Sequence, residues 1–142
     1  MIREYTEQDK EMLKDYLDEE PYGRVILTAV EEYGTDRPFQ TVYLDVRDGK
    51  LEGVYLCICR NIMLYCKENK VDIDFLEQMI SVMVPDKVAG RKDNVNIVSW
   101  LLTDYQAEYG KRLPEVCGEN SELLEWMTEE EKYGGEWSVL VK

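Results

Sequence analysis

The chain contains four cysteines and no histidine. Without histidine there can be no Ser/His or Cys/His nucleophile pair and no His-ligated metal site. Catalysis would therefore depend on Asp, Glu, Tyr, Lys or Cys side chains. The cysteines are Cys57, Cys59, Cys66 and Cys117.

The spacing of the cysteines bears on metal binding. Cys57 and Cys59 stand two apart in an apolar run, so on a strand they would share a face, and Cys66 could approach them across a hairpin. A three-thiolate metal site is one interpretation. We favour the other, in which these are small buried side chains of a reduced cytosolic protein that holds no metal.

The segment Gly90-Arg91-Lys92 combines a glycine with two basic residues at a predicted strand-to-helix junction. Such a junction can bind an anion at the helix N-terminus. A turn that carries a solvated basic pair explains the same residues, and we prefer that interpretation.

Composition narrows the classes of partner. The 142 residues include 30 Asp and Glu against 17 Lys and Arg, a formal net charge of −13. An acidic chain repels phosphate backbones, which argues against nucleic-acid binding. The longest apolar runs, such as Val25 to Val30, are too short to span a bilayer, and the charged start Met1 to Tyr5 lacks a secretory signal. We expect a cytoplasmic protein.

The N-terminal third predicts one strand and two helices. Ile2 to Tyr5 is typical of a strand, and Thr6 is a candidate N-cap for a helix over Glu7 to Glu19. Pro21 ends that helix and can open a second one that runs to Tyr33.

The middle of the chain predicts an antiparallel meander. Its strands cover Thr41 to Val46, Leu51 to Cys59 and Ile62 to Cys66. Asp48-Gly49 is a strong hairpin signal, and Arg60-Asn61 is a candidate for the second turn.

Further elements follow the meander. A helix capped by Asp72 or Asp74 should end at Pro85. The remaining predictions are a strand over Lys87 to Ala89, a helix from Asp93 to Leu102, a helix from Ser121 to Met127 and a final strand over Trp137 to Val141.

This order resembles the fold of the GNAT acetyltransferases. The stretches IREYTEQDKEMLKDYLDEEP, FQTVYLDVRDGKLEGVYLCICRNIMLY and VAGRKDNVNIV look like the N-terminal half of a group of bacterial tandem GNAT-like proteins. In that group a degenerate N-terminal unit precedes a catalytic GNAT unit. The resemblance covers about Ile2 to Leu102.

The resemblance implies where a cofactor would bind. In the GNAT family a Gln/Arg-x-x-Gly-x-Gly/Ala loop after the last meander strand binds the pyrophosphate of acetyl-CoA through backbone N–H groups. The matching stretch, Tyr65 to Asp72, contains no glycine, so side chains would keep the backbone away from phosphate. Glu68 and Asp72 add negative charge there, which Lys67 and Lys70 offset only in part.

The resemblance also implies a Tyr general acid after the last helix and a Glu base on a central strand. Tyr105, Tyr109 and Glu52 are in the corresponding regions. Ten tyrosines make such a coincidence common, and Glu52 at the hairpin is expected to be solvent-exposed. We assign no catalytic, cofactor-binding or metal-ligating residue.

These observations predict one GNAT-like domain over residues 1–142, either alone or as the N-terminal part of a longer two-domain protein. Its class is α/β (α+β), with a mixed, mostly antiparallel central sheet and helices on both faces. We expect a non-catalytic domain without its own cofactor that supports a C-terminal catalytic GNAT unit. One alternative is an active acetyl-CoA-dependent small-molecule N-acetyltransferase with a divergent cofactor loop. Another is a stand-alone ligand-binding or regulatory domain whose acidic cleft takes a cationic metabolite.

Overall fold

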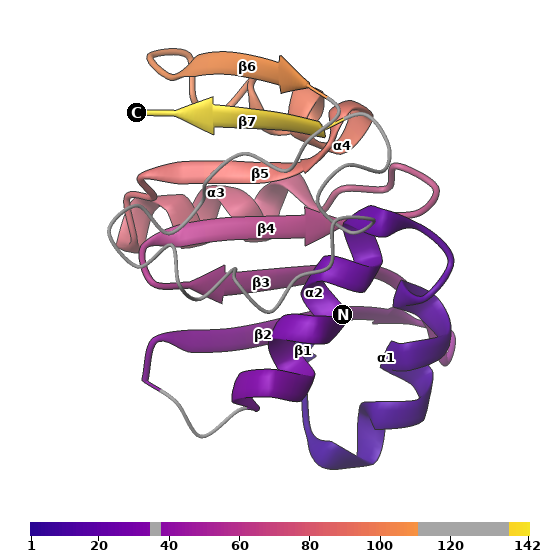
Figure 1. The fold of residues 1–142 in the computed structure, drawn as a ribbon. Helices are drawn as coiled ribbons and strands as arrows, with labels where there is room; N and C mark the ends of the chain where they lie inside the picture. Colours follow the sequence, from indigo (N-terminus) through magenta and orange to yellow (C-terminus); the bar gives the residue numbers. More distant parts are fainter. Residues whose placement is uncertain (35–37, 111–136) are drawn as a thin grey trace.

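The computed structural model describes residues 1–34, 38–110 and 137–142. Within these ranges one sheet has the strand order β1-β2-β3-β4-β5-β7-β6 (Figure 1). Neighbouring strands are antiparallel except β4 and β5, which are parallel. The predicted mixed, mostly antiparallel sheet is confirmed.

Apart from the strand β6, the described elements follow the predicted order. The strands are β1 (Ile2–Glu4), β2 (Gln40–Arg47), β3 (Lys50–Ile58), β4 (Asn61–Tyr65), β5 (Lys87–Arg91), β6 (Gln106–Gly110) and β7 (Trp137–Val141). The helices are α1 (Lys10–Leu17), α2 (Pro21–Tyr33), α3 (Ile73–Val82) and α4 (Lys92–Val98), with a short 3-10 helix, Glu7–Asp9, before α1.

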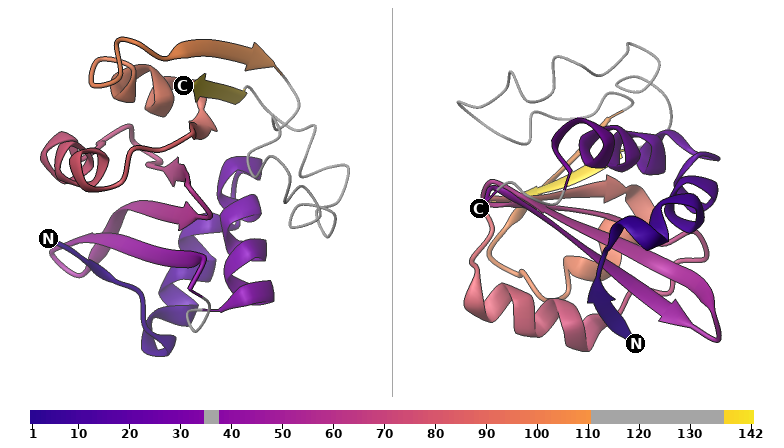
Figure 2. Two further views of the ribbon diagram at one scale, coloured as in Figure 1. Left: turned by 90° about the vertical axis from the view of Figure 1, so that its left-hand side faces the viewer. Right: turned by 90° about the horizontal axis from the view of Figure 1, so that it is seen from below.

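Two apolar cores form because the helices cover both faces of the sheet. Leu13 of α1 and Ile26 of α2 pack on one face with Leu56 of β3. Leu76 of α3 packs on the other face with Tyr55, from the same strand as Leu56. Figure 2 shows α1 and α2 on one side of the sheet and α3 on the other. Because successive side chains of β3 point to opposite faces of the sheet, this one strand contributes residues to both cores.

Two hairpins build the meander, and one was predicted at the wrong residues. Asp48 and Gly49 both have positive φ, as a tight two-residue hairpin loop requires, and this turn is confirmed. The second turn is not Arg60-Asn61. Ile58 pairs with Asn61, so the loop is Cys59-Arg60, and Cys59 has a φ of 57°. Asn61 begins β4 instead.

The start of the first helical segment is held by a charged cluster. Thr6 is the N-cap, and its backbone N–H donates to the Asp9 carboxylate at 2.9 Å. The Arg3 guanidinium binds both carboxylate oxygens of Asp9, at 2.7 and 2.6 Å, and lowers the pKa of that carboxyl to about 2. The predicted helix over Glu7 to Glu19 therefore exists as a 3-10 turn followed by α1.

The region after β5 differs most from the sequence prediction. The predicted helix from Asp93 to Leu102 is shorter, because α4 ends at Val98 and turns follow it. The strand β6 was not predicted. Its side chains from Gln106 to Tyr109 are all exposed at the sheet edge, so no apolar alternation marks it.

Some predictions lie outside the described residues, namely the helix from Ser121 to Met127 and the thiol Cys117. Among the described residues, no helix is both long and apolar enough to cross a membrane.

Candidate functional site

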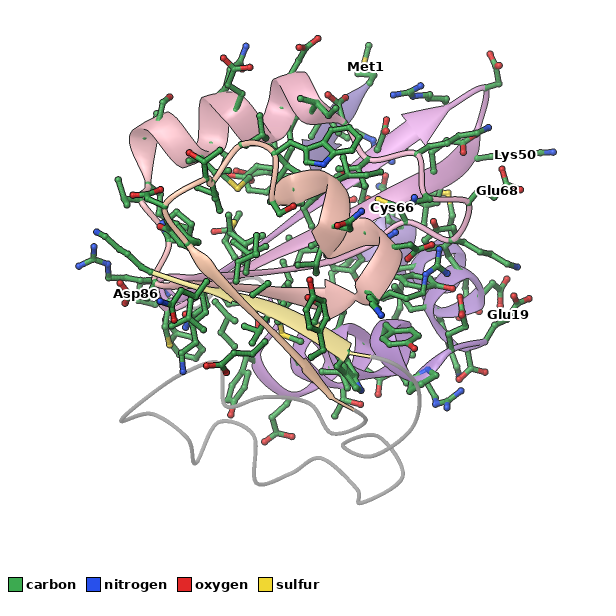
Figure 3. All side chains as sticks on the ribbon, turned by 90° about the horizontal axis from the view of Figure 1, so that it is seen from above. Met1, Glu19, Lys50, Cys66, Glu68 and Asp86 are labelled. Carbon is green, nitrogen blue, oxygen red and sulfur yellow. The ribbon has the colours of Figure 1, made fainter. Side chains whose placement is uncertain are left out.

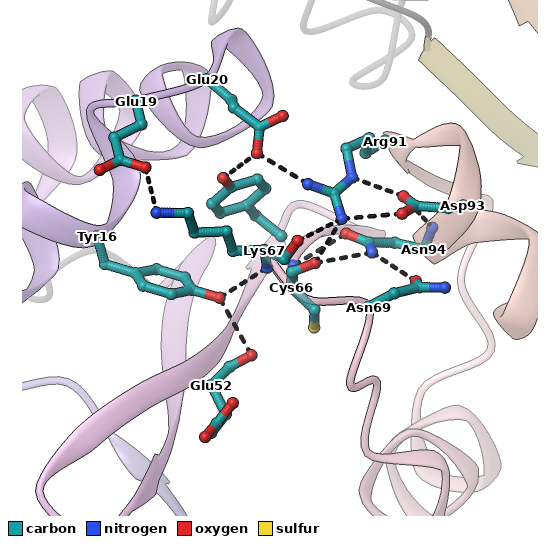
Figure 4. Close-up of polar contacts among 11 residues, drawn as sticks. Tyr16, Glu19, Glu20, Glu52, Cys66, Lys67, Asn69, Arg91, Asp93 and Asn94 are labelled. Atoms are coloured by element: carbon teal, nitrogen blue, oxygen red, sulfur yellow. Dashed lines mark hydrogen bonds and ion pairs between the residues drawn. The ribbon is translucent and has the colours of Figure 1, made fainter.

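The site is the loop from Cys66 to Asp72, at the point where β4 and β5 separate. The two parallel strands pair from Asn61 and Lys87 as far as Leu64 and Gly90. Beyond that point β4 continues into the loop and then α3, whereas β5 continues into α4. Side chains from three other parts of the chain converge on the loop (Figure 4).

Asn94 occupies the gap between the separating strands. Its side chain is fully buried, at 0% exposure. Its Oδ1 accepts from the Cys66 backbone N–H at 2.9 Å, and its Nδ2 donates to the Cys66 carbonyl at 3.0 Å. The carboxamide therefore binds Cys66 as the peptide of a neighbouring strand would. Its Nδ2 also reaches Asn69 Oδ1 at 2.8 Å.

Two tyrosines satisfy further amides of the loop. The Lys67 N–H donates to the hydroxyl of Tyr16 at 2.8 Å, and that hydroxyl donates to the Glu52 carbonyl at 3.1 Å. The Asp72 N–H donates to the hydroxyl of Tyr55 at 2.8 Å. Burial raises the pKa of both phenols, so both hydroxyls stay protonated at neutral pH.

Arg91 ties the loop to α2 and α4. Its Nη2 donates to the carbonyls of Cys66 and Lys67, at 2.9 and 2.7 Å. Its Nη1 binds Glu20 at 2.8 Å, and its Nε binds Asp93 at 2.6 Å. The prediction of a solvated basic pair is therefore wrong for Arg91, whose side chain is only 15% exposed. Two carboxylates neutralise its charge.

The ring of Tyr65 lies beneath this guanidinium. The carbon at the centre of the Arg91 guanidinium is 5.6 Å from the ring centroid, within cation–π range. The Tyr65 hydroxyl donates to the same Glu20 carboxylate that binds Arg91. Burial, followed by the hydrogen bond to Glu20, raises the pKa of Tyr65.

The lysines of the loop are paired with carboxylates. Lys67 forms an ion pair with Glu19 of the α1–α2 connection. Lys70 lies 3.4 Å from Glu68 and 3.7 Å from Glu52. Glu52 was expected to be exposed at the hairpin, but its side chain is only 21% exposed because it packs beside the loop.

A turn at Asn69 shapes the loop. Asn69 has a φ of 61°, and its N–H donates to the Cys66 carbonyl at 2.9 Å. Asparagine tolerates this left-handed conformation better than most residues. Because the Asn69 N–H donates within the turn, it does not point outward to a ligand.

The candidate catalytic residues do not meet. Tyr105 donates its hydroxyl to the carbonyl of Pro85, next to Asp86. Figure 3 shows Asp86 at one end of the molecule and Glu68 of the loop at the other. Tyr109 is 61% exposed on β6, with the Lys92 ammonium 5.1 Å from its ring centroid. Glu52 lies at the loop, beside Lys70, and among the described residues no hydrogen bond joins it to Tyr105 or Tyr109.

The three described cysteines lie on both faces of the sheet. Cys57 and Cys66 belong to the core beneath α3 and α4, but Cys59 contacts the core beneath α1 and α2. The expectation that Cys57 and Cys59 share a face is wrong, because β3 ends at Ile58 and Cys59 adopts a left-handed turn. In the described part of the chain, no group of three or more Cys, Asp and Glu side chains could hold a metal ion.

Cys57 and Cys66 should resist alkylation in the native protein. Burial raises the pKa of both thiols from 9.0 to about 12, so at pH 8 the thiolate population should fall by about 1000-fold. Mass spectrometry of peptides after iodoacetamide treatment should show both residues unlabelled in buffer and labelled in concentrated urea. Labelling in buffer at the rate seen in urea would contradict this prediction.

Comparisons with known proteins bear on the fold alone. No protein-family model matches the sequence, and no curated protein matches it. Among solved structures, a probable acetyltransferase from Staphylococcus epidermidis aligns with a TM-score of 0.53, over 100% of this chain and 97% of that one, at 10% identity. A GNAT-family acetyltransferase from Streptococcus pneumoniae aligns with a TM-score of 0.51, over 100% and 98% of the two chains, also at 10% identity.

The two alignments run the full length of single acetyltransferase chains and include the sheet described above. At this level of identity they establish architecture, not residue roles. The chain has the fold of the GNAT acetyltransferases.

Proposed function

We propose that this chain is a non-catalytic GNAT-like domain that supports a catalytic GNAT acetyltransferase unit. The observation that carries the proposal is that four of the seven backbone amides in the loop after β4 already have acceptors within the protein. The amides of Cys66, Lys67, Asn69 and Asp72 all donate to oxygen atoms of the protein itself. Backbone amides that already have partners gain little from binding a pyrophosphate.

The charge around the loop supports the same proposal. A pyrophosphate would lie close to Glu68 and Asp72 of the loop and to Glu19 and Glu20 of the neighbouring connection. Lys67 and Lys70 are already paired with carboxylates. The residues present therefore do not fit the pyrophosphate of acetyl-CoA. A domain of this fold without its cofactor can still act as a folded partner, and the resemblance to N-terminal units of tandem GNAT proteins suggests a catalytic unit as that partner.

The main alternative is an active N-acetyltransferase with a divergent cofactor loop, working in the cytoplasm on a small amine. Acetyl-CoA would then depend on side chains instead of glycine-loop amides. Lys67 and Lys70 are the side chains of the loop that could take this role.

A second alternative is a stand-alone domain for a cationic metabolite. A groove of about 510 Å³ between β1 and α3 supports it. Glu4, Asp72 and Asp74 give this groove three carboxylates, and the rings of Tyr43 and Phe75 lie 5.3 Å apart in its wall. Spermidine should raise the melting temperature if this alternative holds.

An acetyl-transfer assay distinguishes the proposal from the active enzyme. The protein, acetyl-CoA and a panel of amines are incubated, and released CoA is separated by chromatography. We expect no CoA release above the rate without protein. Turnover that disappears when Lys67 and Lys70 are changed to Glu, but persists in the exposed-surface control Lys50→Glu, would overturn the proposal.

A further inference from the structure

A small cavity lies between α1 and α2, at the end of this helix pair remote from the loop. Its volume is about 170 Å³. The side chains of Leu13, Leu27 and Val30 give it an apolar wall, and Tyr5 and Gly34 help to close it. Sites for drug-sized ligands start at about 300 Å³, and a water takes about 30 Å³ of liquid, so this space suits a compact metabolite.

Tyr5 presents a polar group to this cavity. Its side chain lines the cavity, and the residue is only 6% exposed. Among the described residues its hydroxyl has no hydrogen-bond partner. Burial and then the carboxylates of Glu7, Asp9 and Glu31 raise the pKa of Tyr5, so the hydroxyl remains a proton donor at neutral pH. This hydroxyl is therefore available to donate a hydrogen bond to a bound polar group.

The rim of the cavity carries both signs of charge. Lys10 and Lys14 stand one turn apart on α1, and Glu31 of α2 and Glu7 of the 3-10 helix contribute carboxylates. None of these four forms an ion pair with another described residue. Two lysines at this spacing on a helix repel each other, so local helix stability does not explain them.

We propose that this cavity binds a free α-amino acid with a small aliphatic side chain. The aliphatic group lies against Leu13, Leu27 and Val30. The carboxylate pairs with the lysines of α1, and the ammonium pairs with the glutamates. The hydroxyl of Tyr5 forms a hydrogen bond with the bound amino acid. The cavity is too small for a nucleotide, and its apolar wall disfavours a charged side chain.

Calorimetric titration of the full chain with L-valine tests this proposal. We expect a Kd of about 1 mM or tighter, typical of a small and partly open site. Isovalerate lacks the ammonium group and isobutylamine lacks the carboxylate, so each should bind at least tenfold more weakly. Equal binding of all three compounds would show that only the apolar wall contributes to affinity and would overturn the proposal. The absence of binding heat with valine up to about 10 mM would overturn it as well.

Variants locate the site. Tyr5→Phe removes only the hydroxyl and should weaken valine binding about fivefold, with the fold checked by its melting temperature. Lys10→Gln combined with Lys14→Gln should weaken it about tenfold, whereas Lys50→Gln on the distant hairpin should leave it unchanged. Valine binding that none of these variants alters would contradict the proposed site. Acetyl-CoA is absent from these titrations, so their outcome is independent of the proposed non-catalytic function.

Discussion

Replacing Asn94 by leucine should lower the free energy of unfolding by about 2–4 kcal/mol. The change removes a fully buried carboxamide and leaves the Cys66 N–H without its acceptor in a site closed to water. It also removes the hydrogen bonds to the Cys66 carbonyl and to Asn69. Urea unfolding followed by circular dichroism measures the loss. Hydrogen exchange at the Cys66 amide should also accelerate more than exchange in the strands β2 and β3.

Asn96 provides the matched control on the same helix. It is exposed, so Asn96→Leu should change stability by no more than about 0.5 kcal/mol. If the two variants were equally stable, Asn94 would not be what holds the loop, and the proposed internal hydrogen bonding of the loop would lose its main support.

Gly23→Ala should destabilise the protein by at least about 2 kcal/mol, although alanine is the better helix former by about 1 kcal/mol. A Cβ at Gly23 would collide with the carbonyl oxygen of Leu17 and lie 2.9 Å from its Cα. Both are backbone atoms at the end of α1, so no side-chain rotation can relieve the overlap. The helices α1 and α2 would have to move apart.

A separation of α1 and α2 would also disturb the loop from Cys66 to Asp72. Tyr16 in the last turn of α1 contacts Lys67, and Glu20 in the α1–α2 connection contacts Arg91. The change is measured by urea unfolding, and Glu32→Ala, at an exposed position of α2, is the control, expected within about 0.5 kcal/mol of the parent. A Gly23→Ala protein as stable as the parent would show that the close approach of the two helices is not required.

The parts of the fold that were predicted correctly have local signals. Asp48-Gly49 specifies its own turn because both residues tolerate positive φ. The apolar spacing around Leu13 and Leu76 identifies helices that cover a sheet, and both lie where expected, on opposite faces. Such features depend on residues a few positions apart, which a single sequence displays directly.

The internal hydrogen bonds of the loop were not predicted from the sequence. The lack of glycine from Tyr65 to Asp72 predicts that the loop forms no phosphate-binding nest, and this stays a prediction. The side chains that bind the loop amides are distant in the sequence, since Tyr16 is 51 residues from Lys67 and Asn94 is 28 residues from Cys66. No periodic pattern marks such contacts. An asparagine beside the buried Val95 was the one available signal, because a polar residue among apolar ones requires partners.

Calorimetric titration of the protein with acetyl-CoA tests most directly whether the loop after β4 has lost its cofactor site. With four of its seven amides bound internally and its lysines paired, the loop should give no measurable binding heat up to about 1 mM acetyl-CoA. A dissociation constant in the low micromolar range, weakened at least tenfold when Lys67 and Lys70 are changed to Glu, would contradict the proposal and assign the chain to the active acetyltransferases.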